Sequence, residues 1–285
     1  PFDRAAFLEG QYERKALINV RGEPERYADL LTLENLDHFI ASADLREGMV
    51  DLTSQRNPIS RDSYIDDNGR ISRVAVAEHY MRGATIILPH LHSSMFNLGE
   101  FCRSLEEVFT CHVQTNIYLT PSGNQGFPPH YDNHDVFVMQ ISGAKAWRLY
   151  GTPVETPYRG EGFESGTHVA GDPTETFTLS AGDCLYLPRG LMHDAENVGD
   201  EPSLHITVGV NVAYPELAPE PEEIWKFSPF LDRVMRTELP TRTRIFHLVF
   251  VLTILFAESL RWLGIRLYTT GTFALYAPNE TRLGL

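Results

Sequence analysis

The stretch from Asn116 to Thr207 contains two short segments that set the expectations for the whole chain: His130-Tyr131-Asp132 and, further along, Pro188-Arg189-Gly190-Leu191-Met192-His193. Residues two apart on a β-strand point the same way, so His130 and Asp132 can both face the inside of a barrel. His193 would add a second imidazole. Two histidines and one carboxylate on one face of a metal are typical of non-haem Fe(II) centres, and they leave positions open for a cosubstrate and oxygen.

The overall composition is that of an ordinary soluble protein, with 42% hydrophobic and 22% charged residues in a chain of 285. Its net charge of −14 argues against a nucleic-acid-binding surface, which is normally basic. An acidic surface suits a basic peptide or protein partner. Solubility alone explains the same charge equally well, so both interpretations stay open.

Cysteine usage and hydropathy give expectations about the compartment. Cys102, Cys111 and Cys184 are odd in number and form no Cys-x-x-Cys pair, so we expect neither a disulfide framework nor a thiolate zinc site, as in a cytoplasmic protein. No signal peptide is visible. The longest apolar run, Ile245 to Ala257, is shorter than the roughly 20 residues that a membrane span needs. We therefore expect no membrane association, and a buried or interface helix at this run.

Secondary structure is expected to change in character along the chain. Hydrophobic spacing predicts helices near the start and over 32–40 and 96–109, with strands at 16–20 and 84–88. From Val113 onward, short strands alternate with turns; we expect Ser142-Gly143 and the turn at 181–183 each to close a hairpin. The long segment Gly151 to Asp172 has the length of a functional loop, and we expect a substrate-facing lid there. The later strands are expected at 113–119, 135–141, 144–150, 176–179, 184–187 and 205–212.

Regular short strands with one long excursion predict a fold that is mainly β with flanking helices, built on a double-stranded β-helix of the jelly-roll type. We expect this domain, with N-terminal helical decoration, to cover residues 1–214. Pro215 to Glu223 has a linker's composition. Residues 215–285 are expected to comprise this linker and a helical C-terminal element through which a homodimer could form.

Two longer patterns resemble a known family. The spacing Gly182-(five residues)-Pro188-Arg189-Gly190-(two residues)-His193-(three residues)-Asn197 is that of the second cupin motif. The wider run from Asn116 to Trp147 resembles the JmjC-type ribosomal oxygenases, with a weaker similarity from Phe7 to Ile18. The close match covers roughly residues 112–210 of the sequence.

The resemblance implies an Fe(II)- and 2-oxoglutarate-dependent dioxygenase that uses O₂ to hydroxylate a side chain in a peptide or protein. It implies that His130, Asp132 and His193 are both the metal ligands and the catalytic residues. Each histidine taken alone would more often be a packed or loop residue, but the three together favour a metal site.

The cosubstrate gives an independent chemical expectation. 2-Oxoglutarate is a dianion, so its far carboxylate needs a buried cation. Lys145 stands alone in an apolar strand, which we expect to pair with the strand leaving the metal site, and the resemblance assigns this position to that carboxylate. It also places Tyr118 on the same carboxylate, Asn116 nearer the metal-bound end, and Thr207 as a further hydroxyl.

Several neighbouring polar residues have less specific expectations. His134 is expected on the substrate side or behind the ligands, and His205 as a packed barrel histidine or a residue behind the ligands. His90 and His92 share a ligand-like spacing, but no carboxylate motif accompanies them, so loop or core positions are favoured. Asp135, Arg148 and Arg189 are expected to be structural or surface charges.

Three functional alternatives remain open on the sequence. The same oxygenase chemistry could act on a free amino acid or small metabolite, and it could remove N-methyl groups. A cupin-fold scaffold that keeps its metal without turnover is the non-enzyme alternative, and it has no need for Lys145 and Tyr118.

Overall fold

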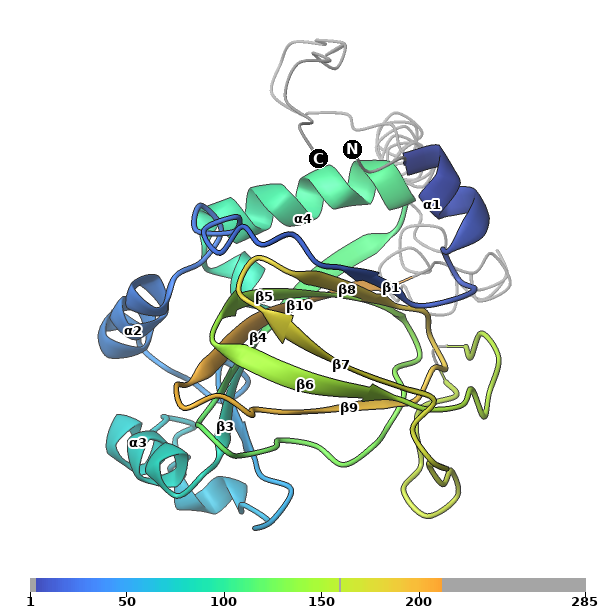
Figure 1. Cartoon of the computed structure of the whole chain (residues 1–285). Coiled ribbons are helices and arrows are strands. Elements are labelled where there is room, and N and C mark those ends of the chain that lie inside the picture. Colours follow the sequence, from blue (N-terminus) through green and yellow to red (C-terminus); the bar gives the residue numbers. More distant parts are fainter. Residues whose placement is uncertain (1–3, 159, 212–285) are drawn as a thin grey trace, which may run out of the picture. The chain divides into compact units, whose positions relative to one another are not determined.

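The computed structural model of the chain describes residues 4–158 and 160–211, which belong to one compact unit (Figure 1). The expected linker, the run Ile245 to Ala257 and the helical C-terminal element lie outside the described residues. The predicted boundary at residue 214 therefore stays a prediction. No helix among the described residues is both long enough and apolar enough to cross a membrane.

Helices dominate the first part of the described chain and strands the second. The helices are α1 (Arg4–Gly10), α2 (Leu33–Ser42), α3 (Arg73–Met81) and α4 (Phe96–Phe109), with short 3-10 turns η1 (Arg61–Ser63) and η2 (Leu91–Ser93). The strands are β1 (Leu17–Asn19), β2 (Asp51–Thr53), β3 (Thr85–Pro89), β4 (His112–Thr120), β5 (Asp135–Ser142), β6 (Ala144–Leu149), β7 (Glu175–Ser180), β8 (Cys184–Leu187), β9 (His193–Glu196) and β10 (Ser203–Asn211).

These strands form two antiparallel sheets. The larger has seven strands in the order β1-β8-β5-β10-β4-β3-β2, and the smaller has three in the order β7-β6-β9. The chain crosses from one sheet to the other between β5 and β6 and again at each step from β7 to β10, which is the winding of a double-stranded β-helix. The predicted fold class, mainly β with flanking helices around a jelly-roll core, is confirmed for the described residues.

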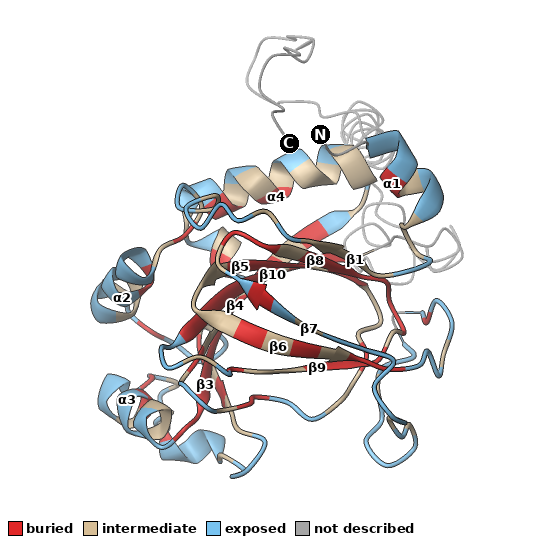
Figure 2. Ribbon diagram, viewed as in Figure 1, coloured by how far each residue is buried: buried red, intermediate tan, exposed pale blue. Residues whose placement is uncertain are grey.

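Buried residues are concentrated in the strands, whereas the outer helices are mostly exposed or intermediate (Figure 2). Val113, Thr115 and Ile117 of β4 are buried; Val113 and Ile117 belong to a core cluster that also contains Leu36, Val76 and Leu98 of helices α2, α3 and α4. The alternate residues of β4 point to the opposite face, toward the smaller sheet, because side chains along a strand alternate between its two faces. The smaller sheet contributes Trp147, Leu149 and Leu179 to a second cluster.

Both predicted hairpins are wrong. β5 pairs with β8 and β10, whereas β6 pairs with β7 and β9, so Ser142-Gly143 carries the chain from one sheet to the other. The turn at 181–183 likewise separates β7 of the small sheet from β8 of the large one. A tight glycine turn serves both geometries equally well, and only the partners available to each strand decide between them.

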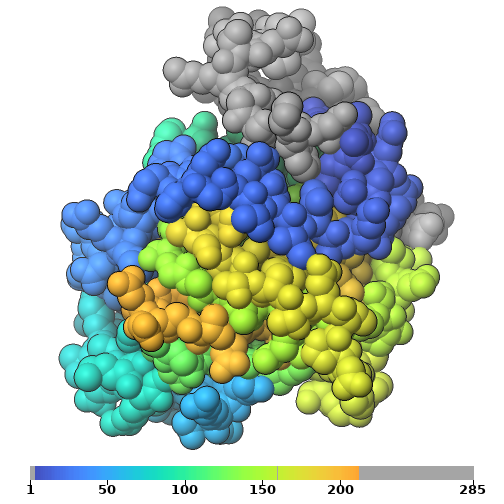
Figure 3. Space-filling model, viewed as in Figure 1, coloured from blue at the N-terminus to red at the C-terminus, as the bar shows by residue number. Residues whose placement is uncertain are grey.

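Two glycines allow these crossings. Gly143 and Gly182 both have positive φ, +65° and +89°. A Cβ atom on Gly143 would overlap with the carbonyl oxygen of Pro202, and one on Gly182 with that of Glu23. The N-terminal segment therefore lies directly against the 181–183 turn, and Figure 3 shows it, in blue, crossing the yellow segment that contains this turn.

The helix predictions were more accurate. α4 has the predicted bounds, and α2 begins after Thr32, whose hydroxyl accepts a hydrogen bond from the backbone of Asn35 at 3.1 Å. α3 was not predicted: Val74 is 70% exposed although apolar, so the hydrophobic spacing of this helix is poor.

The crossing at Gly182 is testable by adding a methyl group. We expect Gly182→Ala to lower the free energy of unfolding by about 1–3 kcal/mol more than Gly123→Ala does. Gly123 is the matched control, because its φ is also positive (+66°) but nothing lies within 4 Å of an added Cβ. Urea denaturation of the two variants measures the difference. Equal losses would mean that backbone conformation alone, and not the contact with Glu23, requires glycine at position 182.

Candidate metal centre and adjoining pocket

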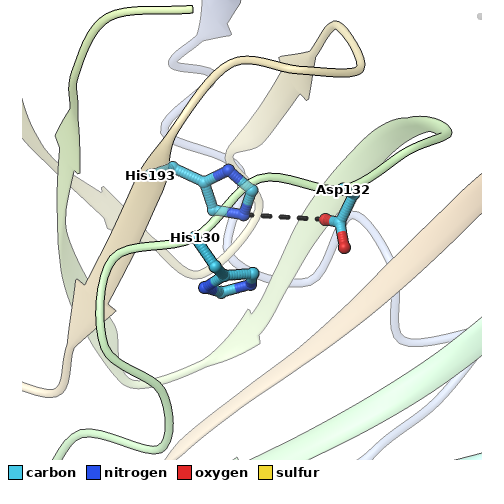
Figure 4. Close-up of side chains that lie close together, drawn as sticks. All are labelled: His130, Asp132 and His193. Atoms are coloured by element: carbon cyan, nitrogen blue, oxygen red, sulfur yellow. Dashed lines mark ion pairs between the residues drawn. The ribbon is translucent and has the colours of Figure 1, made fainter. Parts of the chain in front are cut away.

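Three side chains from two distant parts of the sequence converge at one point. His130, Asp132 and His193 each offer a ligand atom, and these atoms lie within 4.8 Å of one another. His193 Nε2 is 3.7 Å from Asp132 Oδ2, the contact drawn in Figure 4, where the three side chains point toward a shared space. The described residues contain no other such group of histidine, cysteine and carboxylate ligands.

Backbone hydrogen bonds hold the ligand-bearing segments together. His130 N donates to His193 O at 3.0 Å and His193 N donates to His130 O at 2.7 Å, an isolated antiparallel bridge. Gly190 N donates to Asp132 O at 2.9 Å. The expected strand through His130 and Asp132 is not present: Asp132 lies in the loop before β5, and this bridge, not strand alternation, aligns the ligands.

Hydrogen bonds from the Nδ1 atoms orient the imidazole rings of His130 and His193. His130 Nδ1 donates to Pro128 O at 2.9 Å, and His193 Nδ1 donates to Leu191 O at 3.0 Å. A carbonyl can only accept, so each Nδ1 carries the proton and each Nε2 keeps its lone pair for a metal.

The electrostatics favour the metal-binding protonation states. Burial lowers the pKa of His193 to about 4, helped by His130 and opposed by Asp132. Burial opposes ionisation of Asp132, but His193, His134 and His130 lower its pKa overall. A neutral His193 and an ionised Asp132 at neutral pH are the states that bind a divalent cation, so the donor set fits Fe(II).

A cavity of about 240 Å³ adjoins the three ligands and lies between the two sheets. Every residue that the sequence predicted for the cosubstrate lines it: Asn116 and Tyr118 from β4, Thr207 from β10 and Lys145 from β6.

Lys145 is the only lysine among these lining residues and is 4% exposed. Within the part of the chain that the structure describes, no carboxylate lies within ion-pair distance of its ammonium group, and burial lowers its pKa to about 7. The strand expected as its partner was wrong: β6 pairs with β7 and β9, and Leu149 of β6 lies opposite His193. Lys145 therefore faces the cavity from the opposite sheet to Tyr118. A buried cation without a counter-charge fits an anionic ligand.

The cavity offers neutral polar groups around this lysine. Burial, with a smaller contribution from Asp132, raises the pKa of Tyr118, so its phenol stays protonated and can donate a hydrogen bond. Asn116 Oδ1 accepts from His90 N at 3.3 Å. Both groups fit a carboxylate-bearing ligand better than a cation.

A buried network behind the cavity was only partly foreseen. Arg148 Nε donates to Asp194 Oδ1 at 2.7 Å, and its Nη2 donates to Gln125 Oε1 at 3.1 Å. Gln125 Nε2 in turn donates to Asp194 Oδ2 at 3.0 Å. Arg148 is structural as predicted, whereas Asp194 and Gln125 were missed. The position of Asp194 directly after a ligand was the available signal.

Asp135 and Arg189 are also structural, as expected. Asp135 is fully buried and accepts a hydrogen bond from the Tyr186 hydroxyl; burial raises its pKa to about 6 despite Tyr186 and Arg189. Arg189, 6% exposed, forms an ion pair with Glu13 at 2.9 Å. The ion pair connects the N-terminal segment to the segment before His193, and the Tyr186–Asp135 bond connects β8 to the start of β5, just after Asp132.

The remaining histidines divide as the sequence suggested. His92 Nδ1 accepts from Thr115 N at 3.1 Å and His90 begins η2, so both are loop histidines outside the ligand group. His134 lines the cavity beside Asp132. His205 also lines it, stacked on Tyr118, and it was predicted only as a packed or supporting residue.

The predicted lid segment forms a long loop between β6 and β7 that packs beside the ligands. Phe163 lies 6.4 Å from the His130 ring and 5.7 Å from the Tyr131 ring, centroid to centroid. The Tyr131 hydroxyl donates to Gly162 O at 3.2 Å. Tyr131, Tyr150 and Met192 form a small buried cluster under this loop. The loop thus has its own anchor beside the metal ligands.

Comparisons with known proteins agree with this geometry. Residues 91–217 match the model of the JmjC domain. The bifunctional lysine-specific demethylase and histidyl-hydroxylase NO66 of Drosophila pseudoobscura pseudoobscura is 34% identical over 209 residues, covering 73% of this chain and 22% of that protein. Its counterpart in Dictyostelium discoideum is 35% identical over 213 residues, 71% of this chain and 40% of that protein. Ribosomal oxygenase 1 of Gallus gallus is 35% identical over 205 residues, 71% of this chain and 34% of that protein. The chain thus spans less than half the length of these curated relatives.

Solved structures of the Escherichia coli ribosomal oxygenase YcfD have the same fold. One has a TM-score of 0.53 at 16% identity, covering 92% of this chain and 71% of that chain. Another, in complex with cobalt and 2-oxoglutarate, has a TM-score of 0.52 at 15% identity, with coverages of 92% and 70%.

The uncompensated charge of Lys145 predicts a measurable stability cost. We expect Lys145→Met to raise the free energy of unfolding of the ligand-free protein by roughly 2 kcal/mol or more at pH 7, because a buried unpaired ammonium is replaced by an apolar chain. In the unfolded chain Lys145 is protonated below its ordinary pKa of 10.5, whereas in the folded protein it is protonated only below about pH 7. Between these two pH values the unfolded state therefore binds one more proton than the folded state. The increase in the free energy of unfolding that Lys145→Met produces should therefore become smaller as the pH rises toward 10. Urea denaturation at several pH values checks this, with the exposed Lys15→Met as control; a Lys145 variant less stable at pH 7 would contradict the prediction.

Proposed function

We propose that the chain belongs to the JmjC-type ribosomal oxygenase family and is an Fe(II)- and 2-oxoglutarate-dependent oxygenase that hydroxylates an amino-acid side chain in a protein. One observation carries the proposal: a His-Asp-His ligand group opens onto a cavity that also contains a buried lysine, for which residues 4–158 and 160–211 provide no counter-charge. The curated relatives are named as a histidyl-hydroxylase and lysine-specific demethylase, which supports a protein substrate over a free metabolite.

In this proposal His130 Nε2, His193 Nε2 and an Asp132 oxygen hold Fe(II). The two Nδ1–H donations to Pro128 and Leu191 keep the imidazoles oriented, and the backbone bridge keeps the ligands together before metal arrives. When bound, Fe(II) and 2-oxoglutarate would supply the oxidising chemistry: 2-oxoglutarate would be oxidatively decarboxylated to succinate and CO₂, with one oxygen atom of O₂ entering succinate and the other entering the substrate.

The chain's own residues select and position the cosubstrate. Lys145 provides the charge for its far carboxylate, Tyr118 donates a hydrogen bond to the same group, and Asn116 and Thr207 lie along the cavity wall. Because Lys145 is 4% exposed, its attraction for a carboxylate is only weakly screened by water. Binding of the anion would recover the cost of burying the lysine.

We further propose that the protein substrate is basic and is recognised partly by the lid segment. This loop carries Glu155, Glu161, Glu164 and Asp172, and Glu161 and Glu164 raise the pKa of Tyr131 after the larger effect of burial, which places them near the residue next to His130. Phe163 adds an aromatic surface beside the same ligand. A cationic segment with one side chain directed at the metal fits this arrangement.

The remaining partner assignments are proposals as well. We propose that a homodimer forms through residues 215–285. The net charge of −14 argues against a nucleic-acid partner, and we propose no membrane partner. A cytoplasmic location is supported by three free thiols, Cys102, Cys111 and Cys184, whose pKa values burial raises to about 11, as expected of inert packed cysteines.

The first test is an anaerobic titration of Fe(II)-loaded protein with 2-oxoglutarate, followed by the weak visible charge-transfer band of the chelate. We expect the band in the wild type, its loss in His130→Ala because a ligand is missing, and a much higher 2-oxoglutarate requirement in Lys145→Met. His92→Ala is the matched control, since the hydrogen bonds of His92 to other described residues go to Thr115 of β4 and His92 does not line the cavity. A folded, iron-loaded wild type without the band would sink the proposal and favour a cupin scaffold.

Substitutions in the lid segment test whether its acidic residues recognise a basic substrate. We expect the double substitution Glu161→Gln and Glu164→Gln to raise KM for a basic peptide substrate about threefold or more at low salt, while leaving kcat and 2-oxoglutarate binding nearly unchanged. Hydroxylation is followed as the peptide's gain of one oxygen by mass spectrometry. The double substitution Glu100→Gln and Glu107→Gln at exposed positions of α4 removes the same two charges and is the control for net charge. Unchanged KM in the lid variant would remove the lid from substrate recognition.

A further inference from the structure

His205 lies deep in the cavity, where the mechanism proposed above gives it no role. It sits on β10 directly opposite Tyr118 of β4 and is 4% exposed. Its ring stacks on Tyr118 with 4.8 Å between centroids and a 7° interplanar angle, and Trp147 meets it edge-on at 6.0 Å and 74°. Two aromatic side chains therefore fix the plane of this imidazole beside Lys145.

The two ring nitrogens of His205 have different surroundings. Nδ1 is covered and has no hydrogen-bond partner in the described part of the chain. Nε2, in contrast, does not belong to the covered atoms that lack a partner in that part of the chain, and the His205 side chain lines the cavity. Nε2 is therefore the nitrogen that can reach a molecule bound in the cavity.

The surroundings also decide which nitrogen carries the proton. Burial, and then the nearby Lys145, lower the pKa of His205 well below its ordinary value, so the ring is neutral and has a single N–H. Placing that N–H at Nδ1 would leave a covered donor without an acceptor, which is rare in proteins; a covered lone pair is the smaller cost. The proton belongs on Nε2, facing the cavity.

We propose that His205 is a further cosubstrate-binding residue, which donates its Nε2–H to the carboxylate that Lys145 attracts. The inference rests on the proposed function, because that carboxylate is the far end of 2-oxoglutarate. A single carboxylate needs one cation, which Lys145 provides, and a neutral donor adds a hydrogen bond without a second buried charge. A ring that served only to pack against Tyr118 and Trp147 would need no nitrogen, and would avoid the unpaired Nδ1.

Three substitutions of His205 distinguish the contribution of each ring nitrogen to ligand binding from the contribution of ring packing. The amide nitrogen introduced by His205→Gln lies near the position of Nε2, the one introduced by His205→Asn lies near that of Nδ1, and His205→Leu has no donor. Isothermal titration calorimetry of Mn(II)-loaded protein with 2-oxoglutarate measures the dissociation constant without turnover. We expect His205→Leu and His205→Asn to bind roughly 10- to 100-fold more weakly, the range for a hydrogen bond to a charged group, and His205→Gln to stay within about threefold of wild type.

A second ligand makes the test independent of general damage to the pocket. 2-Oxopentanoate has the same ketoacid end but lacks the far carboxylate, so His205→Leu should bind it about as well as the wild type does. A matched loss for both ligands would mean that the substitution disturbs the pocket as a whole, and would overturn the proposal. Melting temperatures of the metal-loaded variants report on folding.

The remaining outcomes are also decisive. His205→Leu that binds 2-oxoglutarate as tightly as wild type, while Lys145→Met does not, overturns the role of His205 and leaves the proposed function standing. Retained affinity in His205→Asn with loss in His205→Gln overturns the assignment to Nε2. A wild type that binds no 2-oxoglutarate overturns the proposed function and this inference together.

Discussion

The antiparallel backbone bridge between His130 and His193 is the constraint on which the site depends. It joins the loop that precedes β5 of the large sheet to β9 of the small sheet, so each ligand-bearing segment is held by the other. The hydrogen bond from Gly190 N to Asp132 O connects the segment of the third ligand to the segment that precedes His193. Because these contacts are made by the backbone, the fold itself brings the three ligand-bearing residues together.

The structure surrounds this bridge with pieces from elsewhere in the chain. Glu13 pairs with Arg189 four residues before His193, and Tyr186 donates to Asp135 three residues after Asp132. On the other side, Tyr131 is fastened to the lid through Gly162. The N-terminal segment and the lid thus both restrain the ligand segments. Local changes in either are transmitted to the ligands through few intervening residues.

The pocket concentrates polar groups that a stability-driven core would avoid. Lys145 has no counter-charge within the described residues, and both Nδ1 of His205 and Nε1 of Trp147 are covered and unpartnered there. Each costs free energy in the empty protein. A carboxylate bound in the cavity would offset the cost of burying Lys145, and the hydrogen bond proposed for Nε2 of His205 would compensate for its unpartnered Nδ1.

The sequence by itself determined the elements that depend on local chemistry and the residues whose spacing metal binding requires. Thr32 capped its helix, α4 had its predicted bounds, and the predicted ligands and cosubstrate residues all lie at one cavity. Only the tertiary structure decided which strands pair. The Ser142-Gly143 turn suits a hairpin as well as a crossing between sheets, so the strand of Lys145 was expected to pair with β5 and lies instead in the opposite sheet. The environment of His205 likewise depends on Tyr118 and Trp147, which are far from it in sequence. Burial and partners arise from contacts between distant residues, and no local pattern encodes them.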